Sequence, residues 1–116
     1  MIRLRGFQKF LTQNKINAAY LTAPITHRYL TGYSDIDSRM MMTPHGLFVI
    51  TDARSAEQVS RAIPDAKIID PTHPDFKEKF RAAVNSRRIG IEAEHLTIAG
   101  RDRLQKLLPK VSLVPI

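Results

Sequence analysis

Residues 19–33 read Ala-Tyr-Leu-Thr-Ala-Pro-Ile-Thr-His-Arg-Tyr-Leu-Thr-Gly-Tyr, and this stretch decides the fold of the chain. The apolar run 18–22 predicts a short buried strand, which Pro24 ends. Proline suits the first turn of a helix, because its fixed φ and missing N–H do no harm there, so we expect a short helix over 25–30. Gly32 can adopt the left-handed conformation that closes a helix. The stretch therefore predicts a strand, a short helix and a loop.

On either side of this stretch, helical and strand patterns alternate. Apolar residues at three- and four-residue steps predict amphipathic helices, and short apolar runs bounded by turn residues predict strands. The expected helices have apolar faces formed by Leu4, Phe7, Phe10 and Leu11, by Ala56, Val59 and Ile63, by Phe76, Phe80, Ala83 and Val84, and by Leu104, Leu107 and Leu108, with Asp52 and Thr97 as caps. The expected strands cover 39–43 and 47–50, joined by the turn Pro44-His45-Gly46, and then 66–69, 88–92 and 111–114.

Strands and helices thus interleave along the chain. Interleaving favours an α/β fold, a single three-layer domain with helices on both faces of one sheet. The two hairpin strands have to run antiparallel, so we expect a mixed sheet that is mainly parallel with one hairpin. The chain has 116 residues, 43% of them hydrophobic and 25% charged. This length and composition predict one domain over residues 1–116, with no room for a second.

Composition excludes several classes of protein. Without cysteine the chain has no disulfide scaffold, thiolate zinc site or cysteine nucleophile, which fits a reducing compartment. The apolar runs are too short to span a bilayer, and the first residues lack a secretory signal, so we expect a cytoplasmic protein without membrane contact. The net charge of +7 would suit an acidic partner, but the basic residues are spread over several expected helices, so nucleic acid is not an expected partner.

Motifs that carry catalysis are missing from the sequence. The glycines stand singly, so neither phosphate-binding loop is present, and no serine lies in a nucleophile elbow. The histidines, His27, His45, His73 and His95, are too scattered to predict a metal site, and we interpret each as structural or solvent-exposed. Glu92 and Glu94 could share one face of a strand as a carboxylate pair, but we favour solvated charges at the strand edge. The methionines at 40–42 are interpreted as strand core.

The loop 33–38 is the segment with the most functional promise. It follows the expected helix end and combines the aromatic Tyr33 with the carboxylates of Asp35 and Asp37, which have no cationic neighbour within the loop. Loops projected from rigid elements often carry function. From the residues alone, a solvated turn whose aspartates accept bonds from nearby backbone N–H groups is the simpler interpretation.

The quoted stretch also resembles a known family. Tyr-Leu-Thr-Gly followed by an aromatic residue, after a strand and a proline-led helix, is similar to the amino-terminal domain shared by creatinase, prolidase and aminopeptidase P. Thr51-Asp52-Ala53-Arg54 with Glu57-Gln58, Arg88-Ile89-Gly90-Ile91-Glu92 and Leu96-Thr97 resemble later parts of that domain in the same order. His27 departs from the asparagine common in that helix, and we infer no role for it. The resemblance implies an α/β fold of the creatinase N-terminal type, which is ribonuclease H-like.

The resemblance also implies a function. In this family the domain precedes a larger pita-bread domain that binds two divalent metal ions and hydrolyses the bond before a proline. We therefore expect the non-catalytic N-terminal domain of a Xaa-Pro dipeptidase or aminopeptidase, inactive alone, with the manganese, cobalt or zinc ions held by residues beyond Ile116. The expected partners are that C-terminal domain, a second copy in a homodimer, and a proline-containing peptide substrate. These residues do not distinguish a prolidase or an aminopeptidase P from a creatinase-like amidinohydrolase.

In related prolidases the loop that corresponds to 33–38 lies near the active-site mouth, which implies a substrate-entrance loop. Asp35 or Asp37 would then orient the amino end of the substrate, with Tyr33 packed beneath the loop. The alternative is a stand-alone module on the same scaffold that binds an acidic protein or nucleic acid. The reading frame after Ile116 distinguishes the two, because it either continues into a metal-binding domain or stops.

Overall fold

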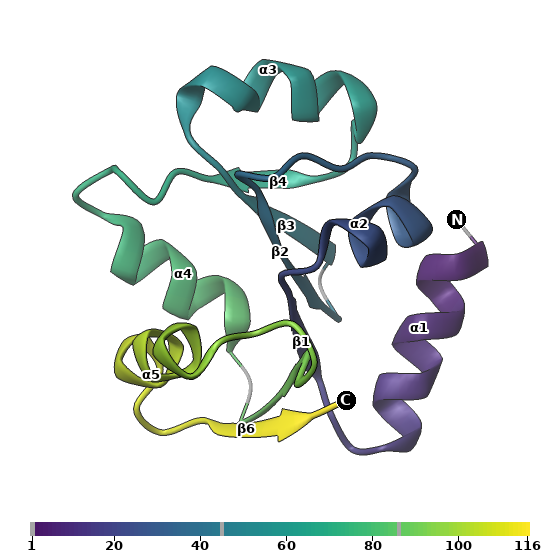
Figure 1. Cartoon of the computed structure of the whole chain (residues 1–116), viewed down its shortest axis with the longest axis vertical. Helices are drawn as coiled ribbons and strands as arrows, with labels where there is room; N and C mark the ends of the chain where they lie inside the picture. Colours follow the sequence, from purple (N-terminus) through teal and green to yellow (C-terminus); the bar gives the residue numbers. More distant parts are fainter. Residues whose placement is uncertain (1, 45, 86) are drawn as a thin grey trace.

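The computed structural model describes residues 2–44, 46–85 and 87–116, and in them one six-stranded sheet forms the centre of the molecule (Figure 1). Its strands are β1 (Ala18–Leu21), β2 (Arg39–Thr43), β3 (Gly46–Ile50), β4 (Lys67–Ile69), β5 (Arg88–Ile91) and β6 (Ser112–Pro115). They lie in the order β4-β3-β2-β1-β5-β6. Strand β2 is antiparallel to β1 and β3, and the other pairings are parallel. The predicted mixed, mainly parallel sheet with one hairpin is therefore confirmed.

Helices cover both faces of this sheet. They are α1 (Ile2–Gln13), α2 (Pro24–Thr31), α3 (Ala53–Ala62), α4 (Phe76–Val84) and α5 (Ile98–Leu107). Residues of α1, α2 and α3 pack on one face, and residues of α4 and α5 pack on the other. Figure 1 shows α1 and α2 on one side of the strands and α4 and α5 on the opposite side. The predicted three-layer α/β domain is thus the observed architecture.

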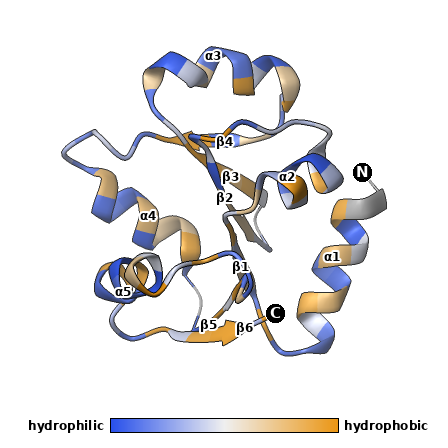
Figure 2. Cartoon of the chain, viewed as in Figure 1, coloured by the Kyte–Doolittle hydropathy of each residue, from blue (hydrophilic) through white to orange (hydrophobic). Residues whose placement is uncertain are grey.

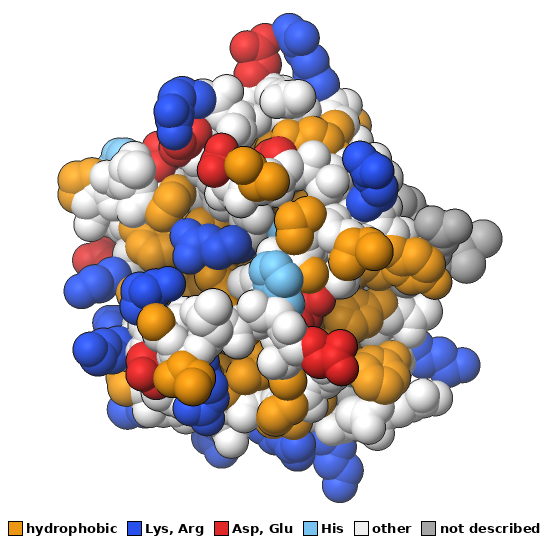
Figure 3. Space-filling model, viewed as in Figure 1, with side chains coloured by type: hydrophobic (Ala, Val, Ile, Leu, Met, Phe, Trp, Pro, Cys, Tyr) orange, Lys and Arg blue, Asp and Glu red, His pale blue; other side chains and the backbone are white. Residues whose placement is uncertain are grey.

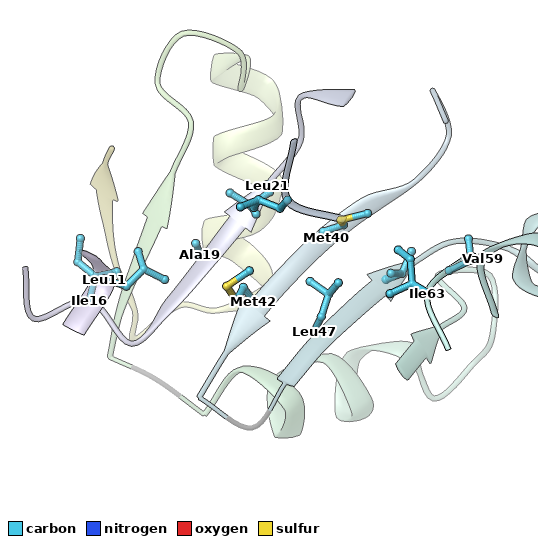
Figure 4. Packing of buried hydrophobic residues seen from close by; sticks show 11 residues of the cluster. Leu11, Ile16, Ala19, Leu21, Met40, Met42, Leu47, Val59 and Ile63 are labelled. Carbon is cyan, nitrogen blue, oxygen red and sulfur yellow. The ribbon is translucent and has the colours of Figure 1, made fainter. Parts of the chain in front are cut away.

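The central strands are buried on both sides, because both faces are covered by helices. Alternate residues of a strand point to opposite faces, so Met40 and Met42 join the α1–α3 side while Met41 joins the α4–α5 side. All three methionines are at most 1% exposed, which confirms the interpretation of this run as strand core. Figure 4 shows Met40 and Met42 beside Ala19 and Leu21 of the neighbouring strand. In Figure 2 the strands are mostly hydrophobic, whereas the helices alternate between hydrophobic and hydrophilic residues.

The α4–α5 side is organised around an aromatic cluster. Phe80 of α4 is 1% exposed. Its ring stacks on Phe76 at a centroid distance of 5.3 Å and meets the edge of Tyr20 from β1 at 6.4 Å. Such a buried ring removes a large apolar area from water and also anchors the helix to the sheet. Phe80 therefore packs α4 against β1 at the centre of the sheet.

The helix ends follow the sequence closely. Asp52 accepts backbone N–H bonds from Arg54 and Ser55 at the start of α3, and Thr97 accepts one from Gly100 at the start of α5. Both caps agree with the sequence prediction. Gly32 closes α2 with a φ of 79°, in the left-handed region that glycine adopts without strain. His45 in the hairpin turn and Ser86 lie outside the described residues.

The expected strand over 88–92 is one residue too long. Strand β5 ends at Ile91, and residues 92–95 turn away from the sheet. Glu92 and Glu94 therefore share no strand face, because the alternation of side chains holds only within a strand. Within residues 2–44, 46–85 and 87–116, no helix has the length and apolar character to cross a membrane.

Phe80→Ala is expected to lower the free energy of unfolding by about 3 to 4 kcal/mol, because it leaves a cavity between α4 and β1. Phe10→Ala is the matched control, since that ring is 45% exposed on α1, and it should cost about 1 kcal/mol or less. Urea unfolding followed by circular dichroism measures both. Equal losses would contradict the central place of Phe80.

Candidate functional site

The start of α2 is held by a carboxylate from a distant part of the chain. Glu92 Oε1 accepts the backbone N–H groups of Thr22 and Ala23 at 2.6 and 2.9 Å, and its Oε2 accepts the Thr26 hydroxyl at 2.6 Å. The residue at the N-cap, Ala23, makes no side-chain cap bond of its own. A carboxylate bound to N–H groups at a helix start is stabilised by charge-assisted hydrogen bonds and by the helix dipole. Glu92 is therefore an anchor between β5 and α2, not a solvated edge charge.

His27 attaches the same helix to the sheet through a buried hydrogen bond. The ring is completely buried, and its Nε2 lies 2.7 Å from the carbonyl oxygen of Leu21 in β1. A carbonyl only accepts, so Nε2 carries the proton and donates. Burial lowers the pKa of His27, and Nδ1 has no hydrogen-bond partner among the described residues. The structural interpretation of this histidine fits its position in the core.

The loop after Gly32 is organised around Asp35. Its Oδ2 accepts the hydroxyls of Tyr33 and Ser38 at 2.7 and 2.8 Å. Its Oδ1 accepts the backbone N–H groups of Asp37 and Ser38 at 2.9 and 2.7 Å. Both oxygens of this carboxylate are therefore used inside the loop, as expected for an aspartate that stabilises a turn. Asp35 gives the loop one defined shape.

Tyr33 and Asp35 form an ionic hydrogen bond. Burial acts to raise the pKa of Asp35, but the bonds from Tyr33, from Ser38 and from the loop backbone outweigh it and hold this pKa below its usual value. Burial and the neighbouring Asp35 carboxylate raise the pKa of Tyr33 to about 12. At neutral pH the tyrosine is thus a neutral donor and the aspartate a charged acceptor. The Tyr33 side chain also packs against the core on the α1–α3 side of the sheet.

The outer part of the loop is open to solvent. Ile36 is 89% exposed, and the carboxylate of Asp37 is exposed beside it. The charge of Asp37 raises the pKa of Arg54 on α3, together with the stronger effect of Asp52, to which Arg54 is hydrogen-bonded at 2.7 Å. The loop itself contains no cation, but the fold brings one within electrostatic reach. Among the loop carboxylates, Asp37 is the one free to meet a ligand.

A hollow of about 620 Å³ lies beside the loop, between Tyr33 and one face of α3. Its other walls are Arg54, Glu57, Gln58, Arg61 and Ala62. Arg61 pairs with Glu57 at 2.6 Å, so the walls carry both signs of charge. Such walls can hold a ligand that itself carries both signs. Sequence reasoning did not select these residues for a site, although their three- and four-residue spacing places them on one helix face.

Metal ligands are not gathered in the described part of the chain. No three His, Asp or Glu side chains come together there as a metal-binding group. His73 pairs with Asp75, and His95 bonds the Thr22 hydroxyl, on different elements. The residues described therefore offer no ligand set for the two divalent ions that the resemblance implies.

One family model and several solved structures match this chain over nearly its whole length. The Creatinase/Prolidase N-terminal domain model matches residues 3–116. The N-terminal domain of the cytoplasmic peptidase PepQ from Mycobacterium tuberculosis H37Rv superposes with a TM-score of 0.84 at 19% identity, covering 99% of this chain and 92% of that one. No curated protein is significantly similar in sequence to this chain.

Two further solved structures are similar in the same way. A Xaa-Pro aminopeptidase from Streptococcus thermophilus has a TM-score of 0.83 at 23% identity over 98% of this chain and 89% of that one. A Xaa-Pro dipeptidase from Bacillus anthracis has a TM-score of 0.86 at 18% identity, and this chain spans all of its own length but 33% of that dipeptidase. At these identities the likeness establishes the fold.

Glu92→Ala is expected to destabilise the protein by about 2 kcal/mol, because it leaves the N–H groups of Thr22 and Ala23 without their acceptor. Hydrogen exchange at these two amides should accelerate more than exchange elsewhere in the sheet. Glu94→Ala is the matched control, since Glu94 is exposed in the same turn, and it should stay within about 0.5 kcal/mol. Unchanged exchange at both amides would contradict the anchoring role.

Asp35→Asn is expected to cost about 1 kcal/mol at neutral pH, through weaker bonds to Tyr33 and Ser38. Because the folded pKa of Asp35 lies below its unfolded value, the carboxylate stabilises the protein above the usual aspartate range, and this stabilisation is lost as the pH falls through the folded pKa. The stability difference between the wild type and the variant should therefore shrink on acidification, as measured by urea unfolding across pH. A difference that is constant with pH would be the contrary result.

Proposed function

Since this chain belongs to the creatinase/prolidase N-terminal domain family, we propose that it is the non-catalytic N-terminal domain of a proline-specific metallopeptidase, a Xaa-Pro dipeptidase or Xaa-Pro aminopeptidase. The observation that carries the proposal is the family match over residues 3–116, together with solved neighbours that are Xaa-Pro peptidases. In this proposal residues 1–116 are one domain, and hydrolysis occurs in a second domain that this chain does not contain.

The fraction of each neighbour's length that this chain covers supports a separate catalytic domain. The chain spans 33% of the Bacillus anthracis dipeptidase and 33% of an X-Pro aminopeptidase from Thermotoga maritima. We assign the two divalent metal ions, manganese, cobalt or zinc, to the remaining part of such a protein. A cytoplasmic location is proposed as well, by analogy with the Mycobacterium tuberculosis peptidase.

The proposed task of the domain is to form part of the substrate entrance with the loop 33–38. Asp37 is exposed at its tip and would meet the positively charged amino end of a peptide. Asp35 would position Asp37 without contacting the substrate, because the bonds of Asp35 to Tyr33 and Ser38 set the shape of the loop. The mixed charges of Arg54 and Glu57 across the adjacent hollow suit a substrate with a charge of each sign.

Exposed apolar side chains support a second proposed task, contact with the catalytic domain or with a second copy. Ile25 and Tyr29, one turn apart on α2, are 80% and 58% exposed, and Ile36 extends from the neighbouring loop. Figure 3 shows hydrophobic side chains grouped between α2 and α1 on this face. Apolar groups clustered at a surface are typical of an interaction site. A homodimer that buries this surface would also bring the loop of one copy toward the other.

The test is steady-state kinetics of the full-length enzyme on several Xaa-Pro substrates. Asp37→Ala should lower kcat/KM several-fold or more, because a shielded contact to a charged group contributes about 1.5 to 3 kcal/mol. Asp35→Ala should lower both kcat/KM and the melting temperature, since it removes the bonds that shape the loop. Asp65→Ala is the matched control, because this aspartate is exposed in a turn outside the loop.

Two outcomes would overturn the proposal. A double Asp35→Ala, Asp37→Ala variant that stays dimeric and keeps wild-type kcat/KM would make the loop a solvated turn. Residues 1–116 alone, given manganese, cobalt or zinc, should show no turnover. Metal-dependent hydrolysis that persists after contaminating peptidases are removed would mean that this domain is itself catalytic.

A further inference from the structure

A second cavity lies apart from the loop, at the carboxyl ends of β1 and β5. It has a volume of about 260 Å³ and is bounded by α5 on its outer side. Tyr20 and Thr22 reach it from the end of β1, Arg39 from the start of β2, and His95 from the turn after β5. In open α/β sheets, ligands bind beyond the carboxyl ends of the strands. The position is thus one where such folds accept small molecules.

Two guanidinium groups face this cavity. Arg39 Nη1 donates to the Tyr20 hydroxyl at 2.9 Å, and the charges of Arg39 and Arg103 both act to lower the pKa of Tyr20 against the dominant effect of burial. Neither arginine forms an ion pair with another described residue. Of the described residues that line the cavity, none is acidic. Two cations without a carboxylate partner therefore share one small space.

Polar groups and an apolar wall complete the lining. The Thr22 hydroxyl and His95 Nδ1 are hydrogen-bonded at 2.9 Å across the gap between β1 and the turn after β5. Leucine side chains at 96, 104 and 107 form the apolar part. At Gly100 a Cβ would lie 2.9 Å from Leu96 Cδ1 and 3.2 Å from Thr97 Oγ1, so a side chain there would require the end of the Leu96 side chain to shift. Gly100 adds no side chain to this wall of the cavity.

From these contacts we propose that the cavity binds a small organic oxyanion, a carboxylate or phosphate carried on a short apolar body. Arg39 and Arg103 neutralise its charge, the hydrogen-bonded pair of Thr22 and His95 donates the proton that its internal bond leaves free, and the leucines contact the apolar part. Arginine suits this task because its planar donors match the oxygens of carboxylate and phosphate. The volume favours a small free molecule over a folded partner. This site is independent of the proposed peptidase function, since it shares no residue with the loop 33–38.

Binding is tested by titrating the protein with succinate and with inorganic phosphate at low salt, followed by backbone and histidine ring chemical shifts. Saturable shifts should be confined to residues around Thr22, His95 and Gly100, with a dissociation constant of about 1 mM or tighter. Succinamide, the neutral analogue of succinate, should not bind. Saturation by succinate but not by phosphate would identify a carboxylate ligand, and the reverse would identify a phosphate.

Matched variants separate the site from general charge attraction. Arg103→Gln, at an exposed position of α5, should weaken binding about tenfold, as should Arg39→Gln. Lys9→Gln removes the same charge from α1 and should leave binding unchanged. Absence of saturable shifts, equal binding of succinamide, or an Arg103→Gln variant that keeps wild-type affinity would each overturn the proposal. Arg103→Gln keeps the test valid if Arg39→Gln unfolds the protein, because Arg103 is outside the core.

Discussion

The carboxylate of Glu92 joins two parts of the chain that are 70 residues apart, and it holds the start of α2 against the end of the sheet. It accepts the N–H groups of Thr22 and Ala23 where α2 begins, so the helix starts at a fixed point above the end of β1. The helix is short, and isolated helices of this length are not stable in water. Its direction is therefore set by this anchor and by the buried bond from His27 to Leu21.

The position of the loop 33–38 follows from the anchoring of α2 by Glu92. The helix is closed by Gly32, so the loop that begins at Tyr33 starts from a point that the helix determines. The loop then adds its own order, because both oxygens of Asp35 are bonded within it. A well-shaped loop on a rigid element can hold an exposed carboxylate such as Asp37 in one place, which a flexible loop could do only at a larger cost in entropy.

The same end of the sheet carries two regions of opposite charge. The acidic loop precedes β2, and the basic cavity lies where β1 and β5 end and β2 begins. Figure 3 shows many Lys and Arg side chains over the α4 and α5 side of the molecule, which is the side of the cavity. On the face drawn there, the Lys and Arg side chains gather on this side, which the net charge of +7 by itself does not reveal. Charge gathered in a confined hollow attracts anions more strongly than the same charge spread over a surface.

The sequence by itself determined the elements, because each rests on local chemistry. The helix over 24–31 follows from Pro24 and Gly32, the start of α3 from Asp52, and the double burial of β2 from its apolar run. Only the tertiary structure decided what Glu92 does, that Arg54 approaches Asp37, and that Arg39 and Arg103 share a cavity. These depend on which strands become neighbours. A hydrogen bond or a charge acts over a few ångströms in space, whatever the separation along the chain, so no local pattern encodes it.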